Sequence, residues 1–219
     1  DGKNAIDILD AKTMQPIDMP DFDNKSITSV NFSDNEEWMR MYVGGSNAPS
    51  DLYTYNLNTK EQYKLTHVLN DEIDAEDLVN AEVIRFKSFD GTEIPAIYYL
   101  PHQASETNKV PALVWVHGGP GGQTRQNFNS LMQYMVNHGY AVLAVNNRGS
   151  SGYGKTFFKM DDRNHGEKDL QDCVEGKNWL AEQPEIDGEK IGILGGSYGG
   201  YMTMAALTYT PEEFDVGVN

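Results

Sequence analysis

The sequence predicts a doubly wound α/β sheet that follows an all-β segment. Two observations support this prediction: residues 79–219 alternate short apolar runs with helical patterns, and residues 1–78 repeat a strand–turn pattern. A third observation is a change of composition near residue 78. Residues 1–78 hold 3 of the 21 glycines and have a net charge of −10, whereas residues 79–219 hold 18 glycines and have a net charge of −6. We therefore expect two domains, or parts of two, that meet near residue 78.

The all-β segment contains an internal repeat. Residues 5–13 match residues 51–59 in pattern, each a short strand followed by a polar turn, at an offset of 46 residues. This period lies in the range of β-propeller blades, about 40–50 residues. Residues 1–78 hold fewer than two such units and cannot close a propeller by themselves, so a plain antiparallel meander is the alternative.

The α/β segment alternates strands with helices along the chain. Apolar runs typical of strands occur at residues 83–89, 94–100, 111–116, 140–145, 191–194 and 214–218. Apolar residues at helical spacing occur within residues 128–136, 170–180 and 202–209. Gly139 and Pro211 end the first and last of these helices. Strands that alternate with helices in this way predict a parallel sheet.

Composition and charge exclude several classes of function. The chain carries 17 Lys and Arg against 33 Asp and Glu, a net charge of −16, which opposes binding to nucleic acid. Its 39% of hydrophobic residues suffices for a core and argues against disorder. No apolar run approaches the roughly 18 residues of a membrane span. The sequence therefore indicates a soluble protein, and it leaves cytoplasmic, periplasmic and secreted locations open.

The single cysteine and the five histidines predict no metal site. Cys173 excludes an internal disulfide and a Cys-rich zinc site, and its helical spacing predicts a buried core thiol. The histidines at 67, 102, 138 and 165 lack the spacing of metal ligands. The acidic run at residues 71–77 lacks the glycine turn of calcium loops, so we expect a solvated linker there.

One glycine-rich segment imitates a phosphate-binding loop. Residues 149–156 match G-x-x-x-x-G-K-[ST] and follow a buried strand. The helix that such a loop must open is poorly supported, because residues 157–166 end in turn-forming residues. No later strand ends in the aspartate that would hold Mg²⁺. We therefore expect Lys155 to bind no phosphate and the protein to use no cofactor.

A second glycine motif has the surroundings that its chemistry requires. Residues 195–199 read Gly-Gly-Ser-Tyr-Gly, the G-x-S-x-G pattern of a nucleophile elbow, with a strand before them and a helix after them. Upstream, residues 117–120 read His-Gly-Gly-Pro at the end of a buried strand. This pair predicts acyl transfer with Ser197 as the nucleophile, and an oxyanion hole formed by the main-chain N–H groups of Tyr198 and Gly119.

Together these motifs resemble the catalytic domain of the prolyl oligopeptidase family of serine peptidases, in particular its dipeptidyl-peptidase and acylaminoacyl-peptidase branches. The resemblance lies in residues 89–91, 117–120, 147–154 and 195–202. It implies an α/β-hydrolase fold after a β-propeller, and hydrolysis of peptide or acyl-peptide bonds through an acyl-enzyme on Ser197. Residues 1–78 would then be the C-terminal part of the propeller. Residues 79–219 would be the N-terminal part of the hydrolase domain, truncated after the nucleophile helix.

The chain departs from the family pattern in its catalytic triad. The expected order is Ser, Asp, His, yet no histidine follows Ser197, and Asp215 lies only 18 residues after it. We therefore expect a fragment that is inactive alone, with an unpaired apolar edge near residues 214–218 that favours association. The sequence leaves open whether the protein forms a homo-oligomer. His117 is expected to pack its loop, and Arg148 to brace its loop through hydrogen bonds.

Two other functions remain compatible with these residues. An esterase or lipase of the same fold would use the same elbow and His-Gly-Gly loop, because both serve any acyl transfer. A non-catalytic binding module, built on a propeller and a degenerate hydrolase, is the second alternative. The propeller-like repeat and the loop at Arg148 favour a peptide substrate.

Overall fold

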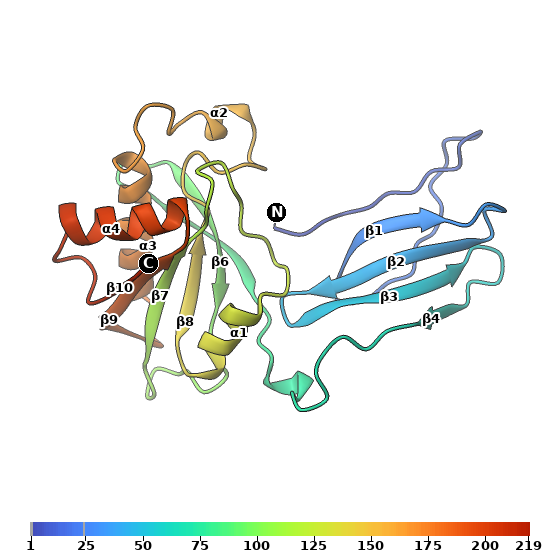
Figure 1. Ribbon diagram of the computed structural model, residues 1–219, viewed down its shortest axis with the longest axis horizontal. Coiled ribbons are helices and arrows are strands. Elements are labelled where there is room, and N and C mark those ends of the chain that lie inside the picture. The colour runs from blue at the N-terminus through green and yellow to red at the C-terminus, as the bar shows by residue number, and fades with distance from the viewer. Residues whose placement is uncertain (1, 24) are drawn as a thin grey trace. The chain divides into compact units, whose positions relative to one another are not determined.

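The computed structural model describes residues 2–23 and 25–219, which form two compact units (Figure 1). The first contains residues 3–80 together with 126–130, and the second contains residues 81–125 together with 131–219. Among the described residues, no helix has the length and apolar character needed to cross a membrane.

The first unit is built on a four-stranded antiparallel sheet whose strands lie side by side in chain order. The strands are β1 (Ser26–Phe32), β2 (Trp38–Gly45), β3 (Ala48–Asn56) and β4 (Gln62–Lys64). Met39, Met41 and Val43 alternate along β2 and therefore share one face, where they form a buried core with Tyr55 of β3.

The predicted repeat is present as two turns with the same hydrogen bonds. The Asp10 carboxylate accepts main-chain N–H groups two and three residues later, at 3.0 and 2.7 Å, and the Asn56 side-chain oxygen does the same at 2.9 and 2.9 Å. Met14 and Lys60 both have positive φ, 56° and 63°, and donate to the carbonyl oxygens of Asp10 and Asn56. Strands β3 and β4 flank the second turn, and a single β-bridge flanks the first.

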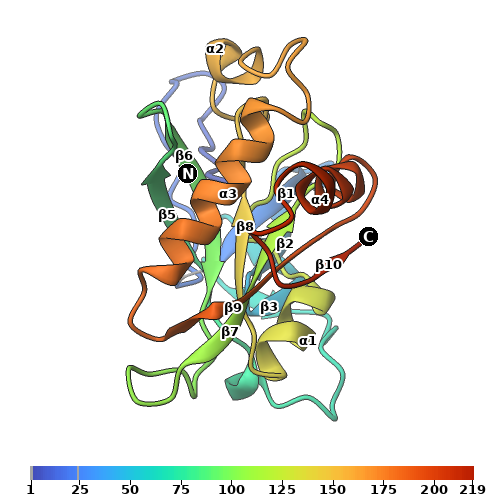
Figure 2. The same cartoon turned by 90° about the vertical axis from the view of Figure 1, so that its left-hand side faces the viewer.

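The second unit is built on a six-stranded sheet in the order β10-β9-β7-β8-β6-β5 (Figure 2). Its strands are β5 (Glu82–Lys87), β6 (Glu93–Tyr99), β7 (Val110–Val116), β8 (Ala141–Val145), β9 (Ile186–Gly195) and β10 (Gly217–Val218). The parallel arrangement predicted from the alternation holds for β8, β7, β9 and β10. Strands β5 and β6 add an antiparallel edge, because the short turn at Asp90 and Gly91 joins neighbouring strands directly.

Helices α3 (Lys168–Ala181) and α4 (Tyr198–Tyr209) pack on this sheet. They share one buried cluster with the strands, to which they contribute Leu170, Cys173, Val174, Leu180, Met202, Ala205 and Ala206. The shorter helices are α1 (Ser130–Asn137) and α2 (Lys155–Phe158), and a 3₁₀ turn, η1 (Ala75–Asp77), lies in the acidic run, which is mostly exposed as expected.

Helix α1 buries a different face from the one its apolar spacing predicts. Met132 and Val136 are buried as expected, but Gln133 is buried with them. Leu131 is 45% exposed, and Phe128 precedes the helix. Positions 132, 133 and 136 share one side of a helix with 3.6 residues per turn. The buried face is therefore rotated by about one residue from the apolar face that the sequence predicts.

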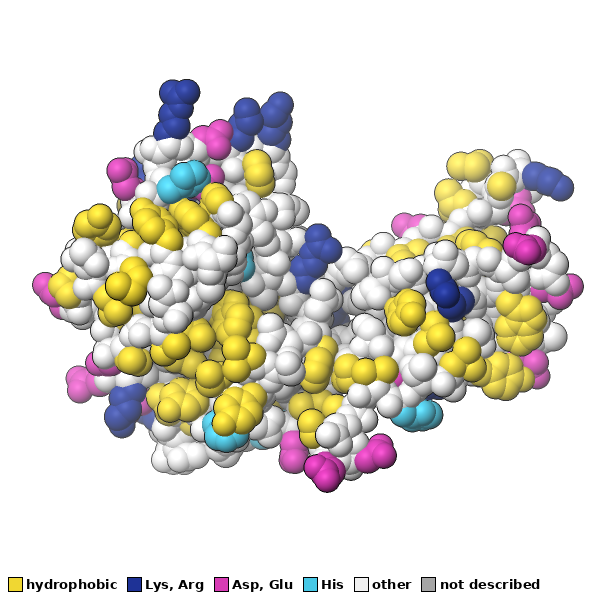
Figure 3. All heavy atoms as spheres, in the orientation of Figure 1, with side chains coloured by type: hydrophobic (Ala, Val, Ile, Leu, Met, Phe, Trp, Pro, Cys, Tyr) yellow, Lys and Arg dark blue, Asp and Glu magenta, His cyan; other side chains and the backbone are white. Residues whose placement is uncertain are grey.

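Apolar side chains are exposed over helix α4 (Figure 3). Tyr201, Met204 and Tyr209 are exposed for 47%, 50% and 71% of their surface. At the neighbouring sheet edge, Val216 and Val218 are each 52% exposed, while Phe214 is buried. The strand expected over residues 214–218 is limited to the two residues of β10.

Candidate active site

Ser197 lies in a tight turn between β9 and α4. Its φ of 57° and ψ of −122° lie outside the regions that L-residues favour, which confirms the predicted strained elbow. The turn closes because Gly195 and Gly199 have no side chains: a Cβ at Gly195 would stand 2.6 Å from the Gly199 carbonyl carbon, and one at Gly199 would overlap the Val116 carbonyl oxygen.

The His-Gly-Gly turn lies against Ser197. Strand β7 pairs with β9 in parallel, with Val116 opposite Gly195, so the turns that follow the two strands leave the sheet at the same edge. A Cβ built on Gly118 would stand 3.8 Å from Ser197 Oγ. The sheet thus brings together two motifs that are almost eighty residues apart in the sequence.

The two sequence-predicted oxyanion donors belong to these two turns, Tyr198 to the elbow and Gly119 to the His-Gly-Gly turn. Tyr198 is the first residue of α4, and the first bond within the helix is donated by the Tyr201 N–H to the Ser197 carbonyl oxygen. The Tyr198 N–H therefore lies in the first helical turn, where the helix supplies no acceptor. Gly119 follows Gly118 and has a φ of 145°, a conformation that favours glycine.

His117 orients the peptide group that carries the Gly119 N–H. Its Nδ1 lies 2.8 Å from the Gly118 carbonyl oxygen, and its Nε2 lies 2.8 Å from Ser150 Oγ. In a planar trans peptide the next N–H points opposite to that carbonyl oxygen, so the Gly119 N–H points away from His117. Burial lowers the pKa of His117 and keeps its ring neutral. These contacts confirm the predicted loop-packing role of His117.

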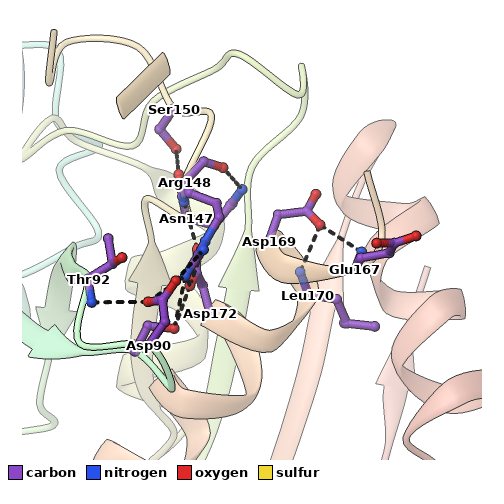
Figure 4. Close-up of polar contacts among 10 residues, drawn as sticks. Asp90, Thr92, Asn147, Arg148, Ser150, Glu167, Asp169, Leu170 and Asp172 are labelled. Atoms are coloured by element: carbon purple, nitrogen blue, oxygen red, sulfur yellow. Dashed lines mark hydrogen bonds and ion pairs between the residues drawn. The ribbon is translucent and has the colours of Figure 1, made fainter. Parts of the chain in front are cut away.

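Arg148 is buried and forms the centre of an ionic cluster with Asp172, which is also buried, and Asp90, which is partly exposed (Figure 4). Its guanidinium binds the Asp172 carboxylate through two groups, Nη2 at 2.8 Å and Nε at 2.9 Å, and reaches Asp90 at 2.9 Å. The same group lies 4.9 Å from the centre of the Phe89 ring. The hydrogen bond from Arg148 lowers the pKa of Asp90. Arg148 therefore braces its loop against α3 and the turn after β5, as predicted.

The segment that matches the phosphate-binding loop, residues 149–156, is not followed by a long helix. Lys155 begins α2, which is only four residues long. Gly149 has a φ of 93°, and a Cβ there would overlap the Asp161 carboxylate. The packing of the segment on itself therefore requires a glycine at position 149.

Sequence reasoning missed one side chain beside the elbow, Asp169. The Tyr198 hydroxyl donates a hydrogen bond of 2.5 Å to Asp169 Oδ2. The N–H groups of Glu167 and Leu170 donate to Asp169 Oδ1, as Figure 4 shows. Burial and the bond to Asp169 raise the pKa of Tyr198. In the sequence, Asp169 is recognisable only as an acid next to an apolar helical stripe. Such a pattern is too common to identify Asp169 as a functional residue.

Two further residues have structural roles. Cys173 is fully buried in the core, as predicted, and burial raises the pKa of its thiol. The Asp215 carboxylate accepts the Ile191 N–H at 2.8 Å and so joins the middle of β9 to the segment before β10. This bond explains why an acid stands so soon after the elbow.

Two family models match parts of the chain. The family model described as prolyl oligopeptidase family matches residues 126–219, which include the whole Ser197 turn. The chain belongs to the prolyl oligopeptidase family. A second family model, for acetyl xylan esterases, matches residues 32–169, a range that ends before Ser197.

Several peptidases match most of the chain. Dipeptidyl aminopeptidase BIII of Pseudoxanthomonas mexicana is 31% identical over 192 residues, covering 85% of this chain and 28% of the relative. The Pyrococcus horikoshii acylaminoacyl peptidase is 32% identical, with a TM-score of 0.74, over 89% of this chain and 31% of that one. A puromycin-hydrolyzing peptidase of Mycobacterium tuberculosis, at 24% identity, shares the fold with a TM-score of 0.83 over 99% of this chain and 34% of its own. The chain spans about a third or less of the length of these proteins.

Proposed function

We propose that a protein carrying this chain hydrolyses peptide bonds through an acyl-enzyme on Ser197. The observation that supports this proposal best is the strained Ser197 turn with Gly118 beside its hydroxyl. Ser197 Oγ attacks the peptide carbonyl carbon while its proton passes to a general base, and the carbonyl oxygen becomes an oxyanion. The N–H groups of Tyr198 and Gly119 stabilise that charge, and loss of one such donor typically lowers the rate by about 10²–10³. Collapse of this oxyanion intermediate breaks the C–N bond, the amine leaves with that proton, and water then hydrolyses the ester on Ser197.

The proposal places the general base outside these 219 residues. A hydrolase of this fold needs a histidine after the nucleophile, and none follows Ser197 in the chain. His117 does not replace it, since both of its ring nitrogens contact the loops. Residues 1–219 alone should therefore hydrolyse peptides negligibly, retaining only the roughly 10³–10⁴-fold acceleration over water that an oxyanion hole and binding provide.

The same proposal assigns the two parts of the chain. Residues 1–78 are the C-terminal part of a β-propeller, which the two equivalent turns 46 residues apart support. Residues 79–219 are the N-terminal part of an α/β-hydrolase domain. The parallel strands β8, β7 and β9, with the elbow after β9, support this assignment.

Covalent labelling tests the nucleophile. A fluorophosphonate should label Ser197 in a longer protein that carries this chain and a downstream Asp and His, and peptidase activity should disappear in Ser197→Ala. Ser29→Ala, in β1, is the matched control and should keep both labelling and activity. Labelling that persists in Ser197→Ala would contradict the assignment, and an unlabelled wild-type protein would favour the non-catalytic binding module.

A second candidate is esterase activity at the same serine, which the acetyl xylan esterase match favours. The two functions are separated by comparing a peptide p-nitroanilide with p-nitrophenyl acetate. A peptidase cleaves the amide with a kcat/KM that depends on the peptide sequence. Efficient cleavage of the ester together with an inert amide would establish an esterase instead.

A further inference from the structure

Asp161, His165 and Asp169 gather their side chains at one point, although they lie four residues apart and match no metal-binding motif. One ligand atom from each lies within 4.8 Å of the others. The chain folds back here because the Asn164 N–H bonds to the Asp161 carbonyl oxygen at 2.8 Å, and Gly166 adopts a φ of 77°. The spacing of the histidines in the sequence does not reveal these contacts, and it predicted no metal site.

One oxygen of the Asp161 carboxylate, Oδ2, is buried without a hydrogen bond from the described residues. The Asp161 side chain is 4% exposed, so water does not replace the missing donor freely. His165 Nδ1 lies 3.3 Å from that oxygen, and the Asp169 carboxylate is nearby. A buried carboxylate requires compensation by a cation or by hydrogen-bond donors, and a second carboxylate increases that need.

We propose that Asp161, His165 and Asp169 bind one divalent transition-metal ion, of the class that includes Zn²⁺. An imidazole nitrogen with carboxylate oxygens suits Zn²⁺ better than Ca²⁺ or Mg²⁺, which prefer oxygen ligands alone. In a tetrahedral site with bonds of about 2.0–2.1 Å, two ligand atoms stand about 3.3 Å apart. The distance from Asp161 Oδ2 to His165 Nδ1 has this value, 3.3 Å.

The surroundings of the three residues fit a metal site. The Asp169 carboxylate is oriented by the N–H groups of Glu167 and Leu170 and by the Tyr198 hydroxyl, the type of outer contact that orients metal ligands. His165 is 43% exposed and lines a surface cavity of about 440 Å³, so the histidine side of the cluster is open to solvent. Water would complete the coordination.

Calorimetric titration of the metal-free protein with zinc chloride tests the proposal. We expect one Zn²⁺ per chain, with binding weakened at least about tenfold in Asp161→Asn and in His165→Gln, because each removes one ligand. His102→Gln is the matched control, since it removes another exposed histidine, and it should bind as the wild type does. X-ray absorption of the zinc complex should show nitrogen and oxygen ligands at about 2.0–2.2 Å.

Three results would overturn the proposal. They are the absence of stoichiometric zinc binding, equal zinc affinity in the wild type and His165→Gln, and binding of Ca²⁺ or Mg²⁺ as tight as that of Zn²⁺. Either of the first two would leave Asp161 and His165 as an ion pair only, and the third would exclude a site that prefers transition metals. If Asp161→Asn does not fold, His165→Gln decides, because this side chain lies at the surface. The readout is binding, so it is independent of the proposed peptidase activity.

Discussion

Gly118 lies directly against Ser197. A Cβ built on Gly118 would stand 3.4 Å from Ser197 Cβ and 3.8 Å from Oγ, which are ordinary van der Waals contacts. The space beside the hydroxyl is therefore wide enough for one methyl group, and in the proposed reaction the substrate carbonyl must enter it.

The substitution Gly118→Ala is expected to separate stability from activity. The melting temperature should stay within about 2 °C of the wild type, because the added methyl group meets no overlap. Peptidase kcat/KM should fall by about tenfold or more, since displacement of a substrate by about 1 Å already costs up to a hundredfold. Thermal unfolding and peptide hydrolysis by a longer active protein measure the two effects. Unchanged kcat/KM would show that the substrate does not approach between residues 118 and 197.

Ser197→Gly and Ser197→Ala should differ in stability although both remove the hydroxyl. Glycine adopts the φ of 57° and ψ of −122° at this position without the penalty that a Cβ brings. We expect the glycine variant to be more stable than the alanine variant by about 1–3 kcal/mol in urea unfolding. This difference already includes the opposing effect that glycine increases the entropy of the unfolded chain. Equal stability would mean that the elbow holds no backbone strain.

Arg148→Ala should destabilise the protein far more than Arg85→Ala. Arg148 is 2% exposed and compensates the fully buried Asp172, so its removal leaves an unpaired buried charge, a change that costs about 3–5 kcal/mol. Arg85 pairs with Glu93 on the same sheet, but the two side chains are 38% and 60% exposed. Exposed pairs contribute about 0–1 kcal/mol. Chemical unfolding of both variants measures the contrast, and similar losses would refute the central role of Arg148.

Asn56→Ala should weaken the second of the two equivalent turns, whereas Asn56→Asp should preserve it. Alanine removes an acceptor of two main-chain hydrogen bonds, which we expect to cost about 1–2 kcal/mol. Aspartate already performs this function at residue 10. Urea unfolding of the two variants tests the equivalence, and an equal loss in both would show that the turns are not interchangeable.

The sequence by itself determined the features that depend on local pattern. The order of strands and helices in residues 79–219, the elbow at Ser197 and the repeat between Asp10 and Asn56 were predicted from periodicity, glycine placement and turn-forming side chains. These features are local because each is set by the conformational preferences of a few consecutive residues. Even there, the buried face of α1 differs from its apolar spacing, since Gln133 is buried and Leu131 is exposed.

Only the tertiary structure decided which distant side chains meet. The ionic cluster of Arg148, the hydrogen bond between Tyr198 and Asp169, and the contact of His117 with Ser150 join residues 24, 29 and 33 positions apart. No periodicity encodes such pairs, because they result from the packing of strand ends and helices around one core. The gathering of Asp161, His165 and Asp169 has the same origin: a chain reversal, and not a spacing, brings a histidine to a buried carboxylate.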